Sequence, residues 1–311
     1  VGGVVPTAGV DVVIAGPVAF ENGDGSCKNL TVNSNCTLNN ATSYYGNERI
    51  LTVNGDVANS GTITSVGSAP FVLRIKGNAT NNGTWTFRRA ELIGTGTQTL
   101  TAGATNRYSS QITVDTISKP SVAAGSNLTF TSSFDLGKRT LDMKTYSITF
   151  VGEGTLLANG TVVSAKDITG LPAYNQYGTA NYPSMYNVTY NGTINIRGRI
   201  QINHSVSFIG NTTVTDTLEG TADYYKSERL LKITGNLTNN GIIRGATDGT
   251  PLALNVSGDI ANNGQWSHSR TDLSGTSNQV IKLNPSKRFE SSFRVTDSLG
   301  MIVAESDVVF T

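Results

Sequence analysis

The sequence predicts an all-β protein, an elongated parallel β-solenoid wound as a right-handed β-helix, with about 20 to 23 residues in each coil and an internal duplication. Three observations predict this fold. A strand-and-turn pattern occurs four times, consecutive copies recur at the spacing of one coil, and the second half of the chain repeats the first. No segment carries the 3.6-residue apolar stripe of an amphipathic helix, so we expect almost no helix.

The repeated pattern is apolar-x-apolar-x-Gly-(Asp/Asn)-x-x-Asn-x-Gly. It is typical of a strand with alternating side chains, a bend at the first glycine, a short second strand and an Asn-Gly turn, where we expect positive φ. The four copies occupy residues 50–63, 73–85, 231–243 and 254–266. The chain is therefore organised around one strand-bend-strand-turn unit.

The spacing between consecutive copies fits one coil of a solenoid. Val53 and Ile75 are 22 residues apart (75 − 53), and Ile233 and Val256 are 23 apart (256 − 233). Because a single coil cannot bury its apolar side alone, these four residues should point inward and stack on their equivalents. The recurrent asparagines of the turns should stack as well, with their amides hydrogen-bonded from coil to coil. The residues expected to face solvent are Thr52, Arg74, Lys232 and Asn255.

Further strands are expected wherever a short segment of alternating apolar and polar residues lies between turn residues. Residues 169–186 interrupt this rhythm with Pro172, Pro183 and several tyrosines and glycines. We therefore predict a first solenoid repeat over 1–156, an excursion or linker over 157–186, and a second repeat over 187–311. The additional strand segments are 10–14, 29–32, 91–100, 111–114, 127–130 and 147–150.

A Tyr-Tyr-x-x-Glu-Arg unit is the most distinctive polar feature of the duplication. Tyr44-Tyr45 with Glu48-Arg49 returns as Tyr224-Tyr225 with Glu228-Arg229, an offset of 180 residues (224 − 44). One hypothesis makes the four tyrosines a contact surface for a ligand or partner, because tyrosine offers contact area at low entropic cost. The other makes the unit a structural loop whose Glu and Arg side chains fix it to the next coil. The sequence leaves both open.

The two ends of the sequence suggest continuation or self-association. The first residue is not Met, which suggests processing or a fragment of a longer protein. Residues 304–311 match 123–131, and the repeat then stops. We therefore expect either a longer repeat array or head-to-tail pairing of copies, with the strand at 308–310 stacking on the one at 10–14.

Composition and charge exclude several functions. The 311 residues have a formal net charge of +1, and their lysines and arginines are scattered. No nucleic-acid partner is therefore expected. No run of eighteen apolar residues is present, so we expect no membrane span. Cys27 and Cys36 could form a disulfide in a secreted chain or remain two buried thiols, and with His204 and His268 as the only histidines we expect no metal or other cofactor.

The sequence offers little for catalysis. Arg74-Ile75-Lys76 resembles a short motif of polygalacturonases, but the paired aspartates and the Gly-His-Gly motif of that family are absent. The alternation of the strand instead makes Arg74 and Lys76 outward, solvated residues. Asp56 and Asp259 follow the bend glycine, a position that other copies fill with asparagine, so we interpret them as turn caps. We predict no catalytic residues and no enzyme activity.

Residues 27–38, followed by 51–63, resemble the repeats of large secreted surface proteins of Bacteroidota, such as gliding-motility adhesins and other cargo of type IX secretion. The similarity covers about residues 11–90 and 187–270. It implies an extracellular, cell-surface location and carries no catalytic residues. Three triplets also resemble the Asp-Ser/Thr-apolar acceptor motif for O-glycosylation in that group, with acceptors Thr116, Thr217 and Ser298.

These observations favour a non-enzymatic extracellular structural protein, a filament subunit, stalk or adhesin segment whose partners are copies of itself and surface glycans. The alternative is a carbohydrate-active β-helix enzyme or a carbohydrate-binding module, with the four repeated tyrosines as sugar platforms. A pair of β-sandwich domains is a further all-β alternative, and the 22-residue recurrence argues against it.

Overall fold

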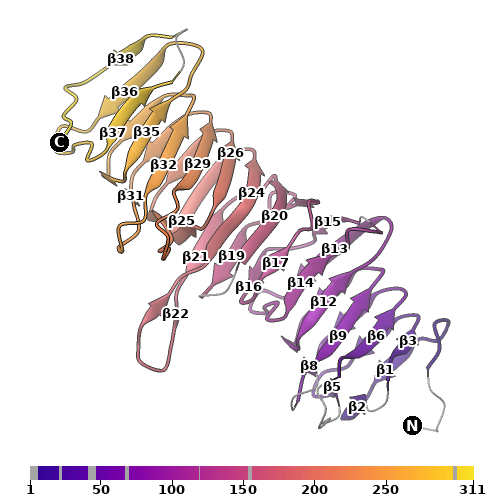
Figure 1. Ribbon diagram of the computed structural model, residues 1–311. Helices are drawn as coiled ribbons and strands as arrows, with labels where there is room; N and C mark the ends of the chain where they lie inside the picture. Colours follow the sequence, from indigo (N-terminus) through magenta and orange to yellow (C-terminus); the bar gives the residue numbers. More distant parts are fainter. Residues whose placement is uncertain are drawn as a thin grey trace. The chain divides into compact units, whose positions relative to one another are not determined.

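The computed structural model describes residues 6–20, 23–40, 47–66, 70–118, 120–152, 156–296 and 300–311. It divides into two compact units, Val1–Tyr146 and Ser147–Thr311, called unit 1 and unit 2 below. Together they contain about 12 turns of an all-β parallel solenoid with roughly 22 residues per coil, and the described residues contain no helix (Figure 1). The predicted fold class is therefore confirmed.

Unit 1 is built from short strands that pair in parallel, coil upon coil. Three ladders run through it: β3-β6-β9-β12-β14-β17, β1-β4-β7-β10-β13-β15-β18 and β2-β5-β8-β11. Its strands are β1 (Val12–Ile14), β2 (Val18–Phe20), β3 (Gly25–Cys27), β4 (Leu30–Val32), β5 (Thr37–Asn40), β6 (Arg49–Val53), β7 (Val57–Asn59), β8 (Thr62–Thr64), β9 (Phe71–Ile75), β10 (Ala79–Asn81), β11 (Thr84–Thr86), β12 (Arg89–Leu92), β13 (Thr97–Ala102), β14 (Gln111–Val114), β15 (Ser121–Ala124), β16 (Leu128–Phe130), β17 (Phe134–Asp135) and β18 (Thr140–Asp142).

Unit 2 also has three parallel ladders: β20-β24-β26-β29-β32-β35-β37, β19-β21-β25-β27-β30-β33-β36-β38 and β25-β28-β31-β34. Its strands are β19 (Ile148–Val151), β20 (Leu156–Val163), β21 (Ile168–Leu171), β22 (Ala173–Tyr174), β23 (Ala180–Asn181), β24 (Ser184–Asn191), β25 (Ile194–Ile202), β26 (Ser205–Ile209), β27 (Thr212–Val214), β28 (Thr217–Gly220), β29 (Arg229–Thr234), β30 (Leu237–Asn239), β31 (Ile242–Arg244), β32 (Leu252–Val256), β33 (Ile260–Asn262), β34 (Gln265–Ser267), β35 (Arg270–Leu273), β36 (Gln279–Leu283), β37 (Ser292–Val295) and β38 (Ile302–Ala304).

The segment 157–186 combines coil strands with one projection. β20, β21 and the start of β24 belong to the parallel ladders. Between them, β22 and β23 pair antiparallel and form a hairpin that leaves the stack of unit 2 (Figure 1). This proline- and tyrosine-rich segment therefore contains both stacked strands and a projecting hairpin.

The predicted register of the repeats is confirmed. Val53 pairs with Ile75 and Ile233 pairs with Val256, and all four side chains are fully buried. Each such aliphatic side chain contributes about 1.5–3 kcal/mol when it leaves water. Of the residues expected to face outward, Lys232 is exposed, and three are partly exposed: Thr52, Arg74 and Asn255.

The asparagines of the turns form the predicted ladders inside both units. Asn59 donates from Nδ2 to Oδ1 of Asn81 at 2.8 Å, and Asn239 donates to Asn262 at the same distance. All four are buried. The amide dipoles of successive coils therefore satisfy one another where no water reaches them.

The glycines that follow these asparagines are required for a different reason from the one predicted. Gly83 and Gly264 do not have positive φ. A Cβ atom added to either would lie 2.0 Å from a carbonyl oxygen of the preceding coil, that of Gly61 or Gly241. Close approach of stacked backbones, rather than a left-handed conformation, therefore excludes a side chain here.

Candidate functional site

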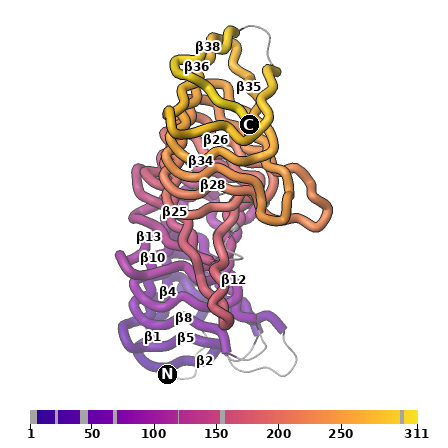
Figure 2. The backbone as a smooth tube through the Cα atoms, turned by 90° about the vertical axis from the view of Figure 1, so that its left-hand side faces the viewer, coloured from indigo at the N-terminus to yellow at the C-terminus, as the bar shows by residue number. Residues whose placement is uncertain are grey.

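The second Tyr-Tyr-x-x-Glu-Arg unit lies in the loop between β28 and β29, and its tyrosines are at the surface. Tyr224 is 90% exposed and Tyr225 is 83% exposed. Their rings pack edge to face, with centroids 5.2 Å apart and planes at 89°. This loop projects from one side of unit 2 beside the loop between β31 and β32 (orange in Figure 2). The first copy, Tyr44 and Tyr45, lies outside the described residues.

The glutamate of each Tyr-Tyr-x-x-Glu-Arg copy pairs with an arginine of a later coil. Arg270 of β35 donates from both terminal nitrogens to the two oxygens of Glu228, at 2.9 and 3.0 Å. In unit 1, Arg89 of β12 forms the matching ion pair with Glu48 at 3.4 Å. The structural hypothesis therefore accounts for the glutamates, and it does not account for the tyrosines.

Buried and partly buried polar groups brace the same loop from within. Arg229 is buried and donates from Nε to Oγ1 of Thr221 at 3.0 Å. The carboxylate of Asp223 accepts the backbone N–H of Ser227 at 3.0 Å and that of Tyr225 at 3.3 Å. Hydrogen bonds from Ser227 hold the pKa of Asp223 below its usual range, so this carboxylate stays ionised as a loop cap.

The neighbouring loop supplies a second carboxylate. Asp248 forms an ion pair with Lys226 and accepts the backbone N–H of Thr250 at 2.9 Å. The hydrogen bond from Lys226, followed by that from Thr250, lowers the pKa of Asp248 far below its usual value. The two loops are therefore joined by charged hydrogen bonds, and the tyrosine pair is presented on a rigid base.

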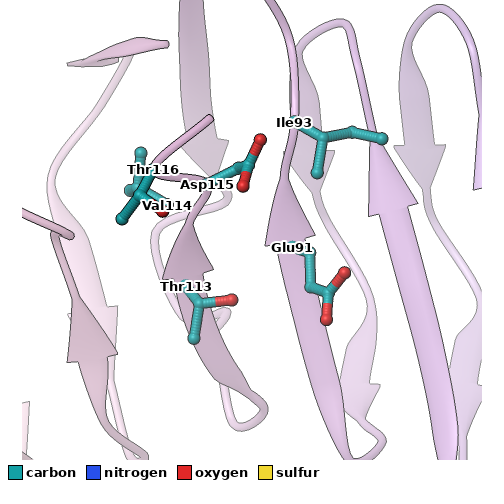
Figure 3. Close-up of a pocket in the computed structure, with 6 residues that line it drawn as sticks. All are labelled: Glu91, Ile93, Thr113, Val114, Asp115 and Thr116. Atoms are coloured by element: carbon teal, nitrogen blue, oxygen red, sulfur yellow. The ribbon is translucent and has the colours of Figure 1, made fainter. Parts of the chain in front are cut away.

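A shallow cavity of about 230 Å³ in unit 1 contains two carboxylates, and Figure 3 shows them projecting from neighbouring segments. Glu91 is bonded to Arg74 at 2.7 Å and to Arg89 at 2.8 Å. Burial raises the pKa of Glu91, but the hydrogen bonds of the two arginines outweigh it and lower the pKa. Asp115 accepts the N–H and the hydroxyl of Ser118 at 2.8 and 2.7 Å, which lowers its pKa too. The lining residues are Glu91, Ile93, Thr113, Val114, Asp115 and Thr116.

The protonation of this pair does not suit glycoside hydrolysis. That reaction needs one carboxyl group that is protonated near neutral pH and can donate to the leaving oxygen. Both groups of the cavity are instead held ionised by donors from the protein. Both carboxylates of the cavity are therefore engaged in structural hydrogen bonds or ion pairs with other side chains and the backbone.

Sequence reasoning missed an ion cluster in unit 2. The carboxylate of Glu219, with a side chain only 1% exposed, lies between Arg199 and Arg244, at 2.7 and 2.8 Å. The guanidinium of Arg199 also lies 4.1 Å from the ring centroid of Tyr182. Gln201, Glu219 and Arg244 occupy one row across three coils, and only the register of the stacked strands reveals this row. A shallow cavity of about 250 Å³ beside the cluster is lined by Ala180, Asn181, Tyr182, Arg199 and Gln201.

The interpretation of Asp56 and Asp259 as turn caps is confirmed. Oδ1 of Asp56 accepts the backbone N–H of Asn78 in the next coil at 2.7 Å. Oδ1 of Asp259 accepts the backbone N–H of Val280 at 2.8 Å in the same way. Each carboxylate therefore links two coils through an otherwise unpaired backbone donor.

The two cysteines are buried free thiols in the structure. Burial, with a smaller contribution from the charge of Asp11, raises the pKa of Cys27 to about 11. Because the thiolate is the reactive form, Cys27 is chemically inert near neutral pH. Cys36 is also buried.

The three expected glycosylation acceptors differ in access. Thr116 is exposed in the loop after β14. Thr217 is 6% exposed in β28, and its hydroxyl donates to Asp216 at 3.1 Å, so the folded chain does not present it to a transferase. Ser298 lies outside the described residues.

Fold and site together define a repeat protein of the parallel β-solenoid class. In the described part of the chain, no group of three or more His, Cys, Asp or Glu side chains is arranged to hold a metal ion. That part also holds no helix long and apolar enough to cross a membrane. No family model matches the chain, and a search of curated proteins finds no match either.

Proposed function

We propose that this chain is a non-enzymatic structural protein of the cell exterior, acting as a stalk, filament subunit or adhesin segment. The observation that carries the proposal is the bonding between coils, which involves side chains as well as backbone. Gln98 accepts the N–H of Gly94 at 2.8 Å and donates to the carbonyl of Ile75 at 2.9 Å. Gln279 repeats this arrangement in unit 2. Such crosslinks suit a load-bearing role.

The same bonding supports resistance to proteolysis. A protease needs a locally opened segment, and opening one coil here breaks backbone ladders, asparagine ladders and turn caps together. An extracellular structural protein benefits from that property. The resemblance of residues 27–38 and 51–63 to repeats of secreted Bacteroidota surface proteins supports the same location.

Assembly with further copies is part of the proposal. Parallel solenoids grow by adding coils that pair with the preceding one, so a longer array or an end-to-end contact between copies extends the same sheets. Light scattering over a range of protein concentrations tests it. Growth of the mean particle mass with concentration is expected, and a constant monomer mass would count against self-association.

An activity assay tests the absence of catalysis. We expect no cleavage of pectin, alginate or chitin oligosaccharides by purified protein, because the carboxylates of the cavity in Figure 3 are occupied. We expect Arg74→Ala and Asp56→Ala to change stability alone. Turnover that either substitution abolishes in a folded protein would make the chain an enzyme and remove the proposal.

A further inference from the structure

The tyrosines of the loop between β28 and β29 are retained in the duplication although they do not hold the loop. The fixing contacts come from Glu228 and Arg229, whereas each tyrosine ring packs on the other. The two halves differ at many positions; for example, Arg74 corresponds to Asn255. The dipeptide Tyr-Tyr is nevertheless identical at 44–45 and 224–225. A surface role explains this identity better than a structural one.

The Tyr224–Tyr225 pair is preorganised for contact. Its backbone is fixed by the Asp223 cap, and the adjoining loop is joined to it through Lys226 and Asp248. Each tyrosine has only two side-chain torsions, and each ring restricts the other. Little conformational freedom remains to be lost when a ligand binds.

The charges around the pair favour an uncharged ligand. Asp223 and Asp248 are ionised, and Arg229 and Lys226 balance them. The loop therefore presents no net charge that would attract a polyanion or a polycation. The carboxylate oxygens are already used as acceptors within the loops.

The size and shape of the pair favour a sugar over a protein. A stable protein interface buries about 800 Å² on each partner, while a tyrosine side chain offers roughly 150–250 Å². Two rings at 89° form an apolar corner with a hydroxyl on each arm. The C–H face of a hexopyranose can stack on one ring while its hydroxyls bond the phenolic oxygens.

We propose that Tyr224 and Tyr225 bind a neutral polysaccharide built from hexopyranose units. This inference rests on the proposed function, since it assigns the adhesive contact of the stalk.

Native gel electrophoresis with a polysaccharide cast into the gel tests the proposal. The probes are hydroxyethylcellulose, mixed-linkage β-glucan and galactomannan, with alginate as the acidic comparison. We expect at least one neutral polymer to retard the protein and alginate to have no effect. Replacing Tyr224 and Tyr225 together by alanine should weaken binding at least tenfold.

The hairpin β22–β23 offers a matched control. Tyr174 and Tyr177 are 70% and 83% exposed in the same unit, so Tyr174→Ala with Tyr177→Ala removes equal aromatic surface elsewhere. This control should bind like the wild type, and both variants should unfold at the wild-type temperature. No retardation by any neutral polymer, retardation by alginate alone, or equal loss in the control would overturn the proposal. The catalytic and light-scattering tests do not depend on these tyrosines, so failure here leaves the structural proposal standing.

Discussion

Each unit has an aromatic layer, which is a group of buried rings around an equivalent tryptophan. The two layers differ in polarity. Trp85 of unit 1 and Trp266 of unit 2 are equivalent, fully buried residues. Beside Trp85 lies Phe87, at a centroid distance of 5.1 Å. At the same distance beside Trp266 lies His268, the counterpart of Phe87 181 residues later (268 − 87). One coil position thus accepts either an apolar or a titratable ring.

The hydrogen bonds of the two layers differ accordingly. Trp266 donates from Nε1 to Oγ of Ser291 at 3.0 Å, and Nε2 of His268 lies 2.9 Å from Oγ1 of Thr271. In unit 1 the indole nitrogen of Trp85 has no partner among the described residues. Ala90 stands at the position equivalent to Thr271, so unit 1 has no hydroxyl there. The repeat therefore keeps aromatic rings at these positions in both units, while the polarity of the second ring and the hydrogen bonds of the layer differ. It also places in unit 2 a buried imidazole that unit 1 does not have at this position.

The largest expected effect lies where the units are alike. Val53→Asp in unit 1 and Ile233→Asp in unit 2 should each cost several kcal/mol of unfolding free energy, because an unpaired carboxylate would enter a dry core. Urea unfolding measures both. A cost below about 1 kcal/mol at either position would show that its register is wrong.

The stabilities of the two units should respond differently to acid pH. Burial lowers the pKa of His268 to about 3, whereas the unfolded chain has the ordinary value near 6.5. Between these pH values the unfolded state binds more protons than the folded state. His268 therefore has no effect on the free energy of unfolding above pH 6.5 and lowers it progressively as the pH falls toward 3. The loss should reach a few kcal/mol, at about 1.4 kcal/mol per pH unit.

Exchanging the two rings isolates this effect from the carboxylates. His268→Phe, which copies unit 1, should flatten the fall in stability between pH 6.5 and pH 3, and Phe87→His should steepen it. Urea titrations at several pH values give the slopes. Identical slopes for the wild type and His268→Phe would show that the imidazole is already solvated or protonated in the folded protein.

The asparagine ladders should show a smaller difference between units. Asn81 accepts from Asn59 and donates to the carbonyl of Arg107 at 3.0 Å, whereas Nδ2 of Asn262 has no partner in the described structure. Asn81→Ala should therefore cost about 1–3 kcal/mol, and Asn262→Ala about 1 kcal/mol less. Chemical unfolding of both variants measures the difference. The reverse order would contradict the hydrogen-bond assignment.

The smallest effect is expected for the ion pairs that fix the loops. Glu228→Gln should cost less than about 1 kcal/mol, because the side chain is partly solvated, and Glu48→Gln should cost still less because its contact is longer. The loss should shrink in high salt. Thermal unfolding at two ionic strengths measures it, and a salt-independent loss above 2 kcal/mol would mean that these pairs do more than fix a surface loop.

Most of the coil architecture could be predicted because its signal is repeated. The 22-residue recurrence of Val53 and Ile75 gives both the coil length and the inward face, and the stacked asparagines follow from the same period. Asp56 could be assigned as a cap because asparagine fills the equivalent position of the next coil, Asn78. Each of these inferences needs only the spacing along the chain.

Other features depend on contacts that spacing does not encode. The role of Gly83 arises from the carbonyl of Gly61, which approaches only after the coils stack. The cluster of Glu219 with Arg199 and Arg244 joins three coils, each with a different local sequence. The exposure of Tyr224 could not be predicted either, because the pattern is compatible with a loop folded onto the sheet.

Immunogold electron microscopy of the cells that produce this protein tests the central claim most directly. A structural solenoid of the cell exterior should carry the label on the outer surface or along fibres that leave it, and the label should persist after brief protease treatment of intact cells. Label confined to the cell interior, or lost at once under that treatment, would contradict the account.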